Sequence, residues 1–214
     1  MTASSNIRTL VSMPFEENTY VVWRPGATAC VVFDPGLQPE LIEECLRAEG
    51  LTLCAILNTH GHADHIAGNE AMKRLAPEAP LVIGVGDAHM LADADANLSA
   101  GFGFAIVSPA ADRIVKEGDS IEAAGLTFRV LDIPGHSPGH IVFVLEETPT
   151  RVFGGDVLFR GSIGRYDFPG GNGPQLLEGI RRKLFTLPAD TVVYPGHGPV
   201  TTVGHEMRTN PYLS

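Results

Sequence analysis

Short apolar runs alternate with segments of helical periodicity along this chain. Residues 18–36 contain two runs rich in Val, Tyr and Phe with an Arg-Pro-Gly turn between them, and we expect two strands there. Residues 39–50 begin with Pro, place their apolar side chains on one face and end at Gly, which predicts an amphipathic helix. A strand over 53–60, a helix over 68–77 and a strand over 79–85 continue the alternation.

The second half of the chain repeats this order. Residues 112–147 predict short strands separated by Gly-containing turns, and 151–159 predict another strand. Residues 173–188 have amphipathic helical spacing, and 190–199 predict a last strand with a polar end. Because both halves run from strands through a helix to a strand that stops at histidine, we expect an α+β fold of two mixed β-sheets flanked by helices, a four-layer sandwich. Residues 92–111 predict a long surface loop that borders a site.

Composition narrows the class of protein. The chain has 214 residues, 44% of them apolar and 19% charged, which is typical of a globular protein and predicts a single domain over residues 1–214. The formal net charge of -10 argues against a nucleic-acid-binding surface, which is normally basic. Residues 1–18 lack the basic and apolar regions of a signal peptide, and no apolar run reaches the roughly 20 residues that cross a bilayer. We expect a cytoplasmic protein without membrane contact.

The strongest chemical signal is the sequence HGHADH at residues 60–65. It follows an apolar strand directly, where a solvated polar turn is the alternative interpretation. In extended backbone His60 and His62 point to the same side, whereas Asp64 and His65 fall where the chain turns into a helix and face a second position nearby. The Gly and Ala between these side chains leave room for an ion. Imidazole and carboxylate are ligands that suit zinc, iron or manganese.

Three distant positions repeat this placement. His136, Asp156 and His197 each come at the end of a predicted strand, next to glycine that permits a tight turn. Seven candidate ligands are too many for one tetrahedral ion and sufficient for two. A carboxylate at Asp156 can bridge both, so we expect two divalent metal ions, zinc in the first place and iron or manganese as alternatives.

The order T-H-x-H-x-D-H, followed by single His, Asp and His residues, resembles the metallo-β-lactamase superfamily over essentially the whole chain. The resemblance implies the αββα sandwich fold and a binuclear metal centre. It also divides the candidates into a first-metal set, a second-metal set and one bridging residue: His60, His62 and His136; Asp64, His65 and His197; and Asp156.

Within the superfamily, the sequence G-D-x-L-F-x-G-x-x-G-R at residues 155–165 and the segment 194–213 resemble the short glyoxalase II-like (hydroxyacylglutathione hydrolase-like) enzymes. This implies a thioesterase that cleaves S-lactoylglutathione or a similar small acyl thioester. Two metals lower the pKa of a bound water from about 15.7 towards about 7, and the resulting metal-bound hydroxide attacks the carbonyl. Asp64 is expected to anchor the second metal and to orient this nucleophile.

Several alternatives remain open. The 155–165 sequence also occurs in persulfide dioxygenases, which use a single iron, and the scaffold also serves lactonases, phosphodiesterases and non-catalytic metal-binding modules. Only seventeen residues follow His197, so we expect no C-terminal helical domain of the kind that supplies the glutathione pocket of full-length glyoxalase II. Arg165 and Tyr166 follow the metal-binding strand and are candidates for contact with a substrate carboxylate, although a structural ion pair is an equal alternative for Arg165.

Residues 135–139, GHSPG, match the G-x-S-x-G nucleophile elbow of serine hydrolases. An elbow serine needs the N–H of the next residue for its oxyanion hole, and Pro138 has none. A strand and not a helix follows, so we expect Ser137 to be a hydrogen-bonding residue and no nucleophile. His140, four residues past His136, is expected to pack against or orient a ligand.

Overall fold

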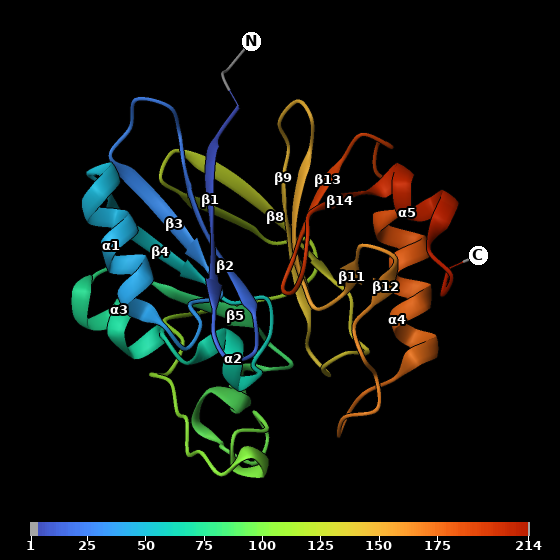
Figure 1. Cartoon of the computed structure of the whole chain (residues 1–214), viewed down its shortest axis with the longest axis horizontal. Coiled ribbons are helices and arrows are strands. Elements are labelled where there is room, and N and C mark those ends of the chain that lie inside the picture. Colours follow the sequence, from blue (N-terminus) through green and yellow to red (C-terminus); the bar gives the residue numbers. More distant parts are fainter. Residues whose placement is uncertain (1–3, 214) are drawn as a thin grey trace.

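The computed structural model describes residues 4–213 and confirms two mixed β-sheets packed face to face (Figure 1). The first sheet has the strand order β1 (Asn6–Ser12), β2 (Glu17–Trp23), β3 (Ala29–Phe33), β4 (Thr52–Leu57), β5 (Leu81–Gly84) and β6 (Arg113–Val115). The second has the order β14 (Thr201–Thr202), β13 (Val192–Pro195), β10 (Arg151–Gly155), β9 (Ile141–Leu145), β8 (Leu126–Asp132) and β7 (Ser120–Ala123). A small hairpin pairs β11 (Leu158–Phe159) with β12 (Ser162–Ile163).

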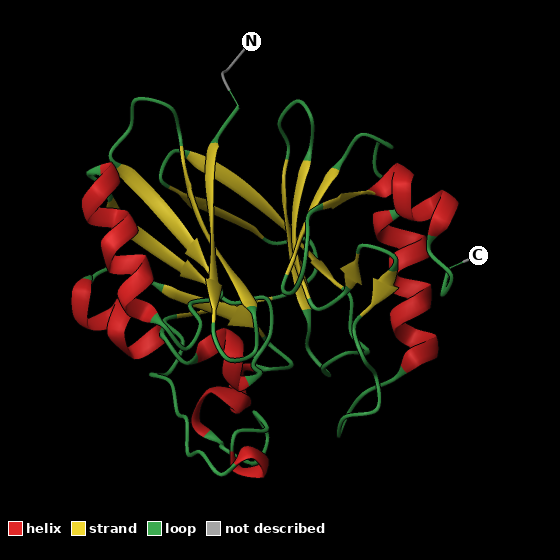
Figure 2. Ribbon diagram, viewed as in Figure 1, coloured by secondary structure: helices red, strands yellow, loops and turns green. Residues whose placement is uncertain are grey.

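Helices cover both outer faces, which completes the four layers (Figure 2). The first sheet carries α1 (Pro39–Glu49) and α3 (Asn69–Leu75); the second carries α4 (Gly173–Gly179), its π-helical continuation η3 (Ile180–Leu184) and α5 (Val203–Thr209). Three short helices lie in the loops, α2 (Ala63–Ile66), η1 (Ala88–Ala92) and η2 (Ala100–Phe102). Among the described residues no helix is long and apolar enough to cross a membrane. Residues 1–3, part of the stretch considered for a signal peptide, lie outside the described residues.

The core between the sheets is aromatic. Phe33 of the first sheet stacks on Phe153 of the second with ring centroids 4.0 Å apart, and it meets Phe128 and Phe143 edge-on at 5.3 and 5.5 Å. All four rings are almost completely buried. Such pairs stabilise a core beyond the area that they bury, so the two sheets are held in one relative position and the loops at their ends meet.

The predicted helices are present. Among the described residues, α5 and the short 3₁₀ helices η1 and η2 were not predicted. At the end of α1, Gly50 has φ 66°, the left-handed conformation that ends helices, and its N–H donates to the carbonyls of Arg47 and Leu46. The helix predicted over 173–188 ends at Leu184. Helix α5 was not predicted because Val203 is its one large apolar side chain in the core, which is too little for an apolar stripe. Its other large buried side chain is a glutamate, Glu206, which accepts hydrogen bonds from Thr201 and Asn210.

Candidate metal centre

The residues expected to hold metal come together at the edge of the sandwich near α2, where loops from both sheets meet (Figure 1). The first sheet supplies side chains from the loop after β4 and from α2, and the second supplies one side chain after each of β8, β10 and β13. In chain order these residues are His60, His62, Asp64, His65, His136, Asp156 and His197.

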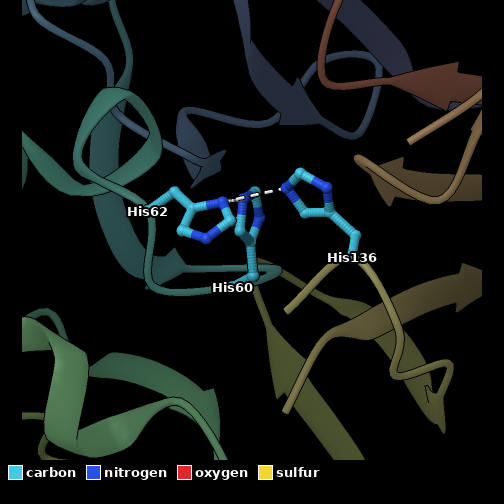
Figure 3. A group of neighbouring side chains, drawn as sticks. All are labelled: His60, His62 and His136. Carbon is cyan, nitrogen blue, oxygen red and sulfur yellow. Dashed lines mark hydrogen bonds between the residues drawn. The ribbon is translucent and has the colours of Figure 1, made fainter. Parts of the chain in front are cut away.

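Three of these histidines form a first group, and Figure 3 shows their rings turned toward one another. The Nδ1 atom of His62 lies 3.1 Å from Nε2 of His60 and 2.9 Å from Nε2 of His136. A single proton can satisfy only one of these two contacts, so nitrogen lone pairs converge on the same point. Convergent lone pairs are the donor arrangement that a metal ion requires.

Hydrogen bonds on the far side of two of these rings, those of His136 and His60, settle which nitrogen is free. The Nδ1 atom of His136 lies 2.8 Å from the carbonyl oxygen of Arg165, which can only accept, so Nδ1 carries the proton and Nε2 keeps its lone pair. Thr59 donates its hydroxyl proton to Asp34 at 2.7 Å, and its oxygen therefore accepts from Nδ1 of His60 at 3.1 Å. Such outer partners orient metal-binding histidines and set their tautomer.

The environment of this group keeps two of its imidazoles, His60 and His62, neutral. Burial lowers the pKa of His60 well below its ordinary value, and the neighbouring imidazoles lower it further. Burial, followed by the charge that His136 would carry, lowers the pKa of His62 to about 3. Because a metal binds the neutral ring, protons compete weakly for these two histidines near neutral pH.

Asp64, His65 and His197 form a second group with a different charge. The Nε2 atoms of His197 and His65 lie 3.3 and 3.7 Å from Oδ2 of Asp64. Burial opposes protonation of both histidines, but the neighbouring carboxylates outweigh it and raise the pKa of each. The Nδ1 atoms again face acceptors, Asp34 and the carbonyl oxygen of Phe15, both at 3.1 Å, so each Nε2 points into the centre.

Asp156 lies between the two groups. Its Oδ1 is 3.5 Å from Nε2 of His65, and its Oδ2 is 3.5 Å from Nε2 of His136 and 3.6 Å from Nε2 of His197. Among the described buried side chains, Nε2 of His65 and Oδ1 of Asp156 have no hydrogen-bond partner. Buried polar atoms are nearly always paired. These two unpaired atoms face each other at the second group, as two ligands of one cation would. The seven side chains together offer enough ligand atoms for two cations.

The sequence analysis missed Asp34, which supports both groups. Asp34 has φ 44°, is buried, and accepts from the N–H and the hydroxyl of Thr59, each at 2.7 Å, as well as from His65. Although its carboxylate lies near His60 and His65, its oxygens are already engaged, so it orients ligands and is not free to act as one. Its signal in the sequence was an aspartate at the end of a strand and next to a Pro-Gly pair, which follows Asp34 but precedes the ligands His136 and His197.

Two details differ from the expectation. Gly61 does not make room for an ion, because a Cβ atom at this position would lie 2.6 Å from Cβ of Met90 and 3.1 Å from the carbonyl oxygen of Asp87. The missing side chain instead allows η1 to pack against the loop. Tyr166 does not line the central cavity; it is half-exposed and its ring lies against Gly173 at the start of α4.

Ser137 is placed as a structural residue. It is fully buried, and its hydroxyl donates to Oδ2 of Asp87 at 2.5 Å. The same carboxylate accepts the N–H of Gly139 at 2.6 Å and the N–H of Gly61 at 3.1 Å. Asp87 therefore ties the loop that carries His136 to the loop from the other sheet, and the G-x-S-x-G match is accidental.

His140 packs behind the first group. Its ring stacks on that of His60 with centroids 4.6 Å apart, and its Nε2 accepts the backbone N–H of Asp156 at 3.0 Å. This contact depends on Gly155, which has φ 45° and whose Cβ would lie 2.8 Å from the same nitrogen. His140 thus positions two of the candidate ligands from outside the centre.

A cavity of about 280 Å³ opens over both groups. Its floor includes the candidate ligands His62, Asp64, His136, Asp156 and His197. Part of the wall comes from residues 97–106, which confirms that the loop predicted over 92–111 borders the site. Arg165 lines the cavity as expected, but its guanidinium pairs with Asp167 at 2.8 and 2.9 Å.

Comparison with known proteins decides the family. The family model described as the metallo-beta-lactamase superfamily matches residues 13–197. The chain belongs to this superfamily. The resemblance inferred from the sequence and the sandwich fold are both confirmed.

Curated relatives match over nearly their full length. The chain is 36% identical over 202 residues to the probable metallo-hydrolase YqgX of Bacillus subtilis (strain 168), covering 94% of each chain. It is 34% identical over 212 residues to the hydroxyacylglutathione hydrolase GloC of Haemophilus influenzae, covering 98% of each chain. The chain is therefore a metallo-hydrolase of the metallo-β-lactamase superfamily.

Solved structures show the same fold. BLEG-1, a B3 metallo-beta-lactamase, has a TM-score of 0.93 and 36% identity, covering 98% of this chain and all of that one. TTHA1623 in a di-iron-bound form has a TM-score of 0.85 and 39% identity, covering 96% and 100%. ETHE1 from Myxococcus xanthus has a TM-score of 0.78 and 33% identity, covering 96% and 83%. One of these neighbours holds two irons, so the fold is compatible with iron.

Proposed function

We propose that this protein is a metal-dependent hydrolase of small acyl thioesters, with S-lactoylglutathione as the first substrate to test. The observation that carries the proposal is the pair of convergent donor groups, joined by Asp156, at the floor of one cavity. GloC supports the thioester, because a relative of the same length bears the name hydroxyacylglutathione hydrolase. The ions would be held by His60, His62 and His136, by Asp64, His65 and His197, and by Asp156 between them.

When bound, divalent ions in such a site lower the pKa of a water towards about 7 and stabilise negative charge on a carbonyl oxygen. The chain's own residues supply orientation. Asp64 lines the cavity, and its carboxylate can accept a hydrogen bond from the attacking water. The water oxygen bonds to the carbonyl carbon and the carbon–sulfur bond breaks. The electron pair of the carbon–sulfur bond stays with sulfur, and sulfur takes up the proton that the water releases. The products are a carboxylic acid and a thiol.

The assay that tests this proposal is hydrolysis of S-lactoylglutathione by metal-replete protein, with and without a chelator. We expect turnover that the chelator abolishes and that zinc, iron or manganese restores. Ser99 is the one hydroxyl-bearing residue that lines the cavity, and its hydroxyl is engaged by the carbonyl oxygen of Ala94 and the N–H of Ile106, which leaves water as the nucleophile. Metal content is measured on the same samples. Metal-replete protein that leaves S-lactoylglutathione and other acyl thioesters intact would reject the proposal.

A second candidate is a mononuclear-iron persulfide dioxygenase. The likeness to ETHE1 over 96% of this chain favours it. Oxygen uptake with glutathione persulfide, by protein loaded with iron, separates the two reactions because hydrolysis consumes no oxygen. A β-lactam belongs in the same panel because of the likeness to BLEG-1.

Replacement of Ser137 by Ala tests the serine-hydrolase interpretation directly. Because the hydroxyl is buried against Asp87, we expect the free energy of unfolding to fall by about 1–3 kcal/mol. Chelator-sensitive hydrolysis should fall by at most about tenfold, whereas loss of a nucleophilic serine costs about 10⁶-fold. Urea denaturation and steady-state kinetics measure the two effects. A loss of turnover near the larger value, in a folded variant, would restore Ser137 as a nucleophile.

A further inference from the structure

The walls of the cavity are aromatic. Phe15, Phe102, Phe104, Phe159 and Phe168 all line it. Phe102 and Phe104 lie on the loop around η2 and are 57% and 55% exposed, although large apolar side chains are usually buried. Phe15 holds Phe102 edge-on, with ring centroids 5.4 Å apart. Exposed apolar side chains gathered around a polar floor mark a binding site for an apolar group.

The walls of the cavity offer no free positive charge to an anionic substrate. Of the residues that line it, all of which the structure describes, Arg165 is the only Lys or Arg. Its guanidinium makes two contacts with Asp167 and lies over the ring of Phe168, 4.0 Å from the centroid. The carboxylates at the floor, Asp64 and Asp156, belong to the donor groups that would hold the ions, so they do not decide how the walls receive a charged group. Glutathione carries two carboxylates, and neither finds an unengaged cation on these walls.

We propose that the preferred substrate is an uncharged thioester with an apolar, aromatic or aliphatic group next to the scissile bond. This inference rests on the proposed thioester hydrolysis and specifies its substrate class. The carbonyl lies at the floor, between the two donor groups, and the apolar group packs among the phenylalanines. Phe102 and Phe104 determine this preference because they form the exposed part of the wall.

Four thioesters test the preference: S-lactoylglutathione, S-phenylacetylglutathione, and the N-acetylcysteamine thioesters of lactate and of phenylacetate. Each kcat/KM is divided by the rate of alkaline hydrolysis of the same compound, which removes differences in intrinsic reactivity. On a common thiol we expect the phenylacetyl compound to exceed the lactoyl compound by about tenfold or more. On a common acyl group, a gain with N-acetylcysteamine shows that the anionic thiol is disfavoured. The first comparison tests the apolar group on the acyl side, and the second tests the charge of the thiol.

A matched pair of variants tests the wall. Phe104 and Val107 lie on the same loop and are both 55% exposed, but only Phe104 lines the cavity. We expect Phe104→Ser to reduce the preference for phenylacetyl over lactoyl by about tenfold and Val107→Ser to leave it unchanged. A second readout is independent of turnover: binding of the phenylacetyl-N-acetylcysteamine analogue with CH₂ in place of sulfur, measured by calorimetry on chelator-treated protein.

The outcomes separate the inference from the proposed function. S-lactoylglutathione as the best substrate after normalisation, or equal effects of the two variants, would overturn the apolar preference and leave thioester hydrolysis standing. Failure of metal-replete protein to cleave any of the four would reject thioester hydrolysis. In that case the binding measurement still tests whether the wall binds an apolar group. Loss of affinity in Phe104→Ser but not in Val107→Ser supports an apolar ligand. Absence of binding to the parent protein overturns the apolar preference.

Discussion

Replacement of Asp156 by Ala is expected to cost at least one bound metal ion per chain and to reduce hydrolysis by about 10³-fold or more. Among residues 4–213, Asp156 is the one carboxylate that lies within 3.6 Å of ligand nitrogens in both groups: that of His136 in the first, and those of His65 and His197 in the second. Removing a single electrostatic group from an active site already costs about 10²–10³-fold in rate. Loss of a shared ligand weakens the binding of both ions, and these ions supply the activated water and stabilise the charge that develops on the substrate.

Metal analysis after exhaustive dialysis measures the first effect, and steady-state kinetics the second. Asp190→Ala is a matched control because it removes one exposed carboxylate outside the centre. It should keep its metal and its activity. Near-normal metal content in folded Asp156→Ala protein would contradict the bridging position of this residue.

Replacement of Asp34 by Asn is expected to weaken metal binding by about 10–100-fold, although Asp34 is not a ligand. The carboxylate accepts three hydrogen bonds, two from Thr59 and one from His65. An amide has one acceptor oxygen and places an NH₂ donor against one of these donors. The orientation of His65 and, through Thr59, of His60 is then lost. Breaking hydrogen bonds to a buried charge should also lower the free energy of unfolding by about 3 kcal/mol.

Competition with a chromogenic chelator measures the change in affinity, and urea denaturation of metal-free protein measures stability. Asp112→Asn provides the comparison, because exposed Asp112 pairs with Lys73 at 2.9 Å, and neither residue is a candidate ligand or lines the cavity. An exposed pair contributes about 0–1 kcal/mol, and its loss should leave the metal affinity unchanged. Equal metal affinity in Asp34→Asn and the parent protein would show that His65 and His60 are oriented without this carboxylate.

The local parts of the fold and the identity of the candidate ligands were predictable because each depends on neighbours in the sequence. The apolar pattern around Pro39 and Gly50 predicts α1, and the structure has it from Pro39 to Glu49. Histidine and aspartate after apolar strands predict ligands at strand ends, and the structure brings these side chains together. The end of the helix predicted over 173–188 and the whole of α5 were harder to predict. In α5, the burial of Glu206 depends on hydrogen-bond partners that the sequence pattern does not reveal.

The sequence by itself determined which side chains are available for metal chemistry and that they stand at strand ends, because strand periodicity and glycine turns are local properties. Only the tertiary structure decided which of them meet, which imidazole nitrogen faces inward, and that Asp34 and His140 support the centre. It also showed that Tyr166 does not line the cavity and that Arg165 forms an ion pair with Asp167. The physical reason is that contacts such as His62 with His136 join residues 74 positions apart. They exist only because the aromatic core fixes one sheet against the other.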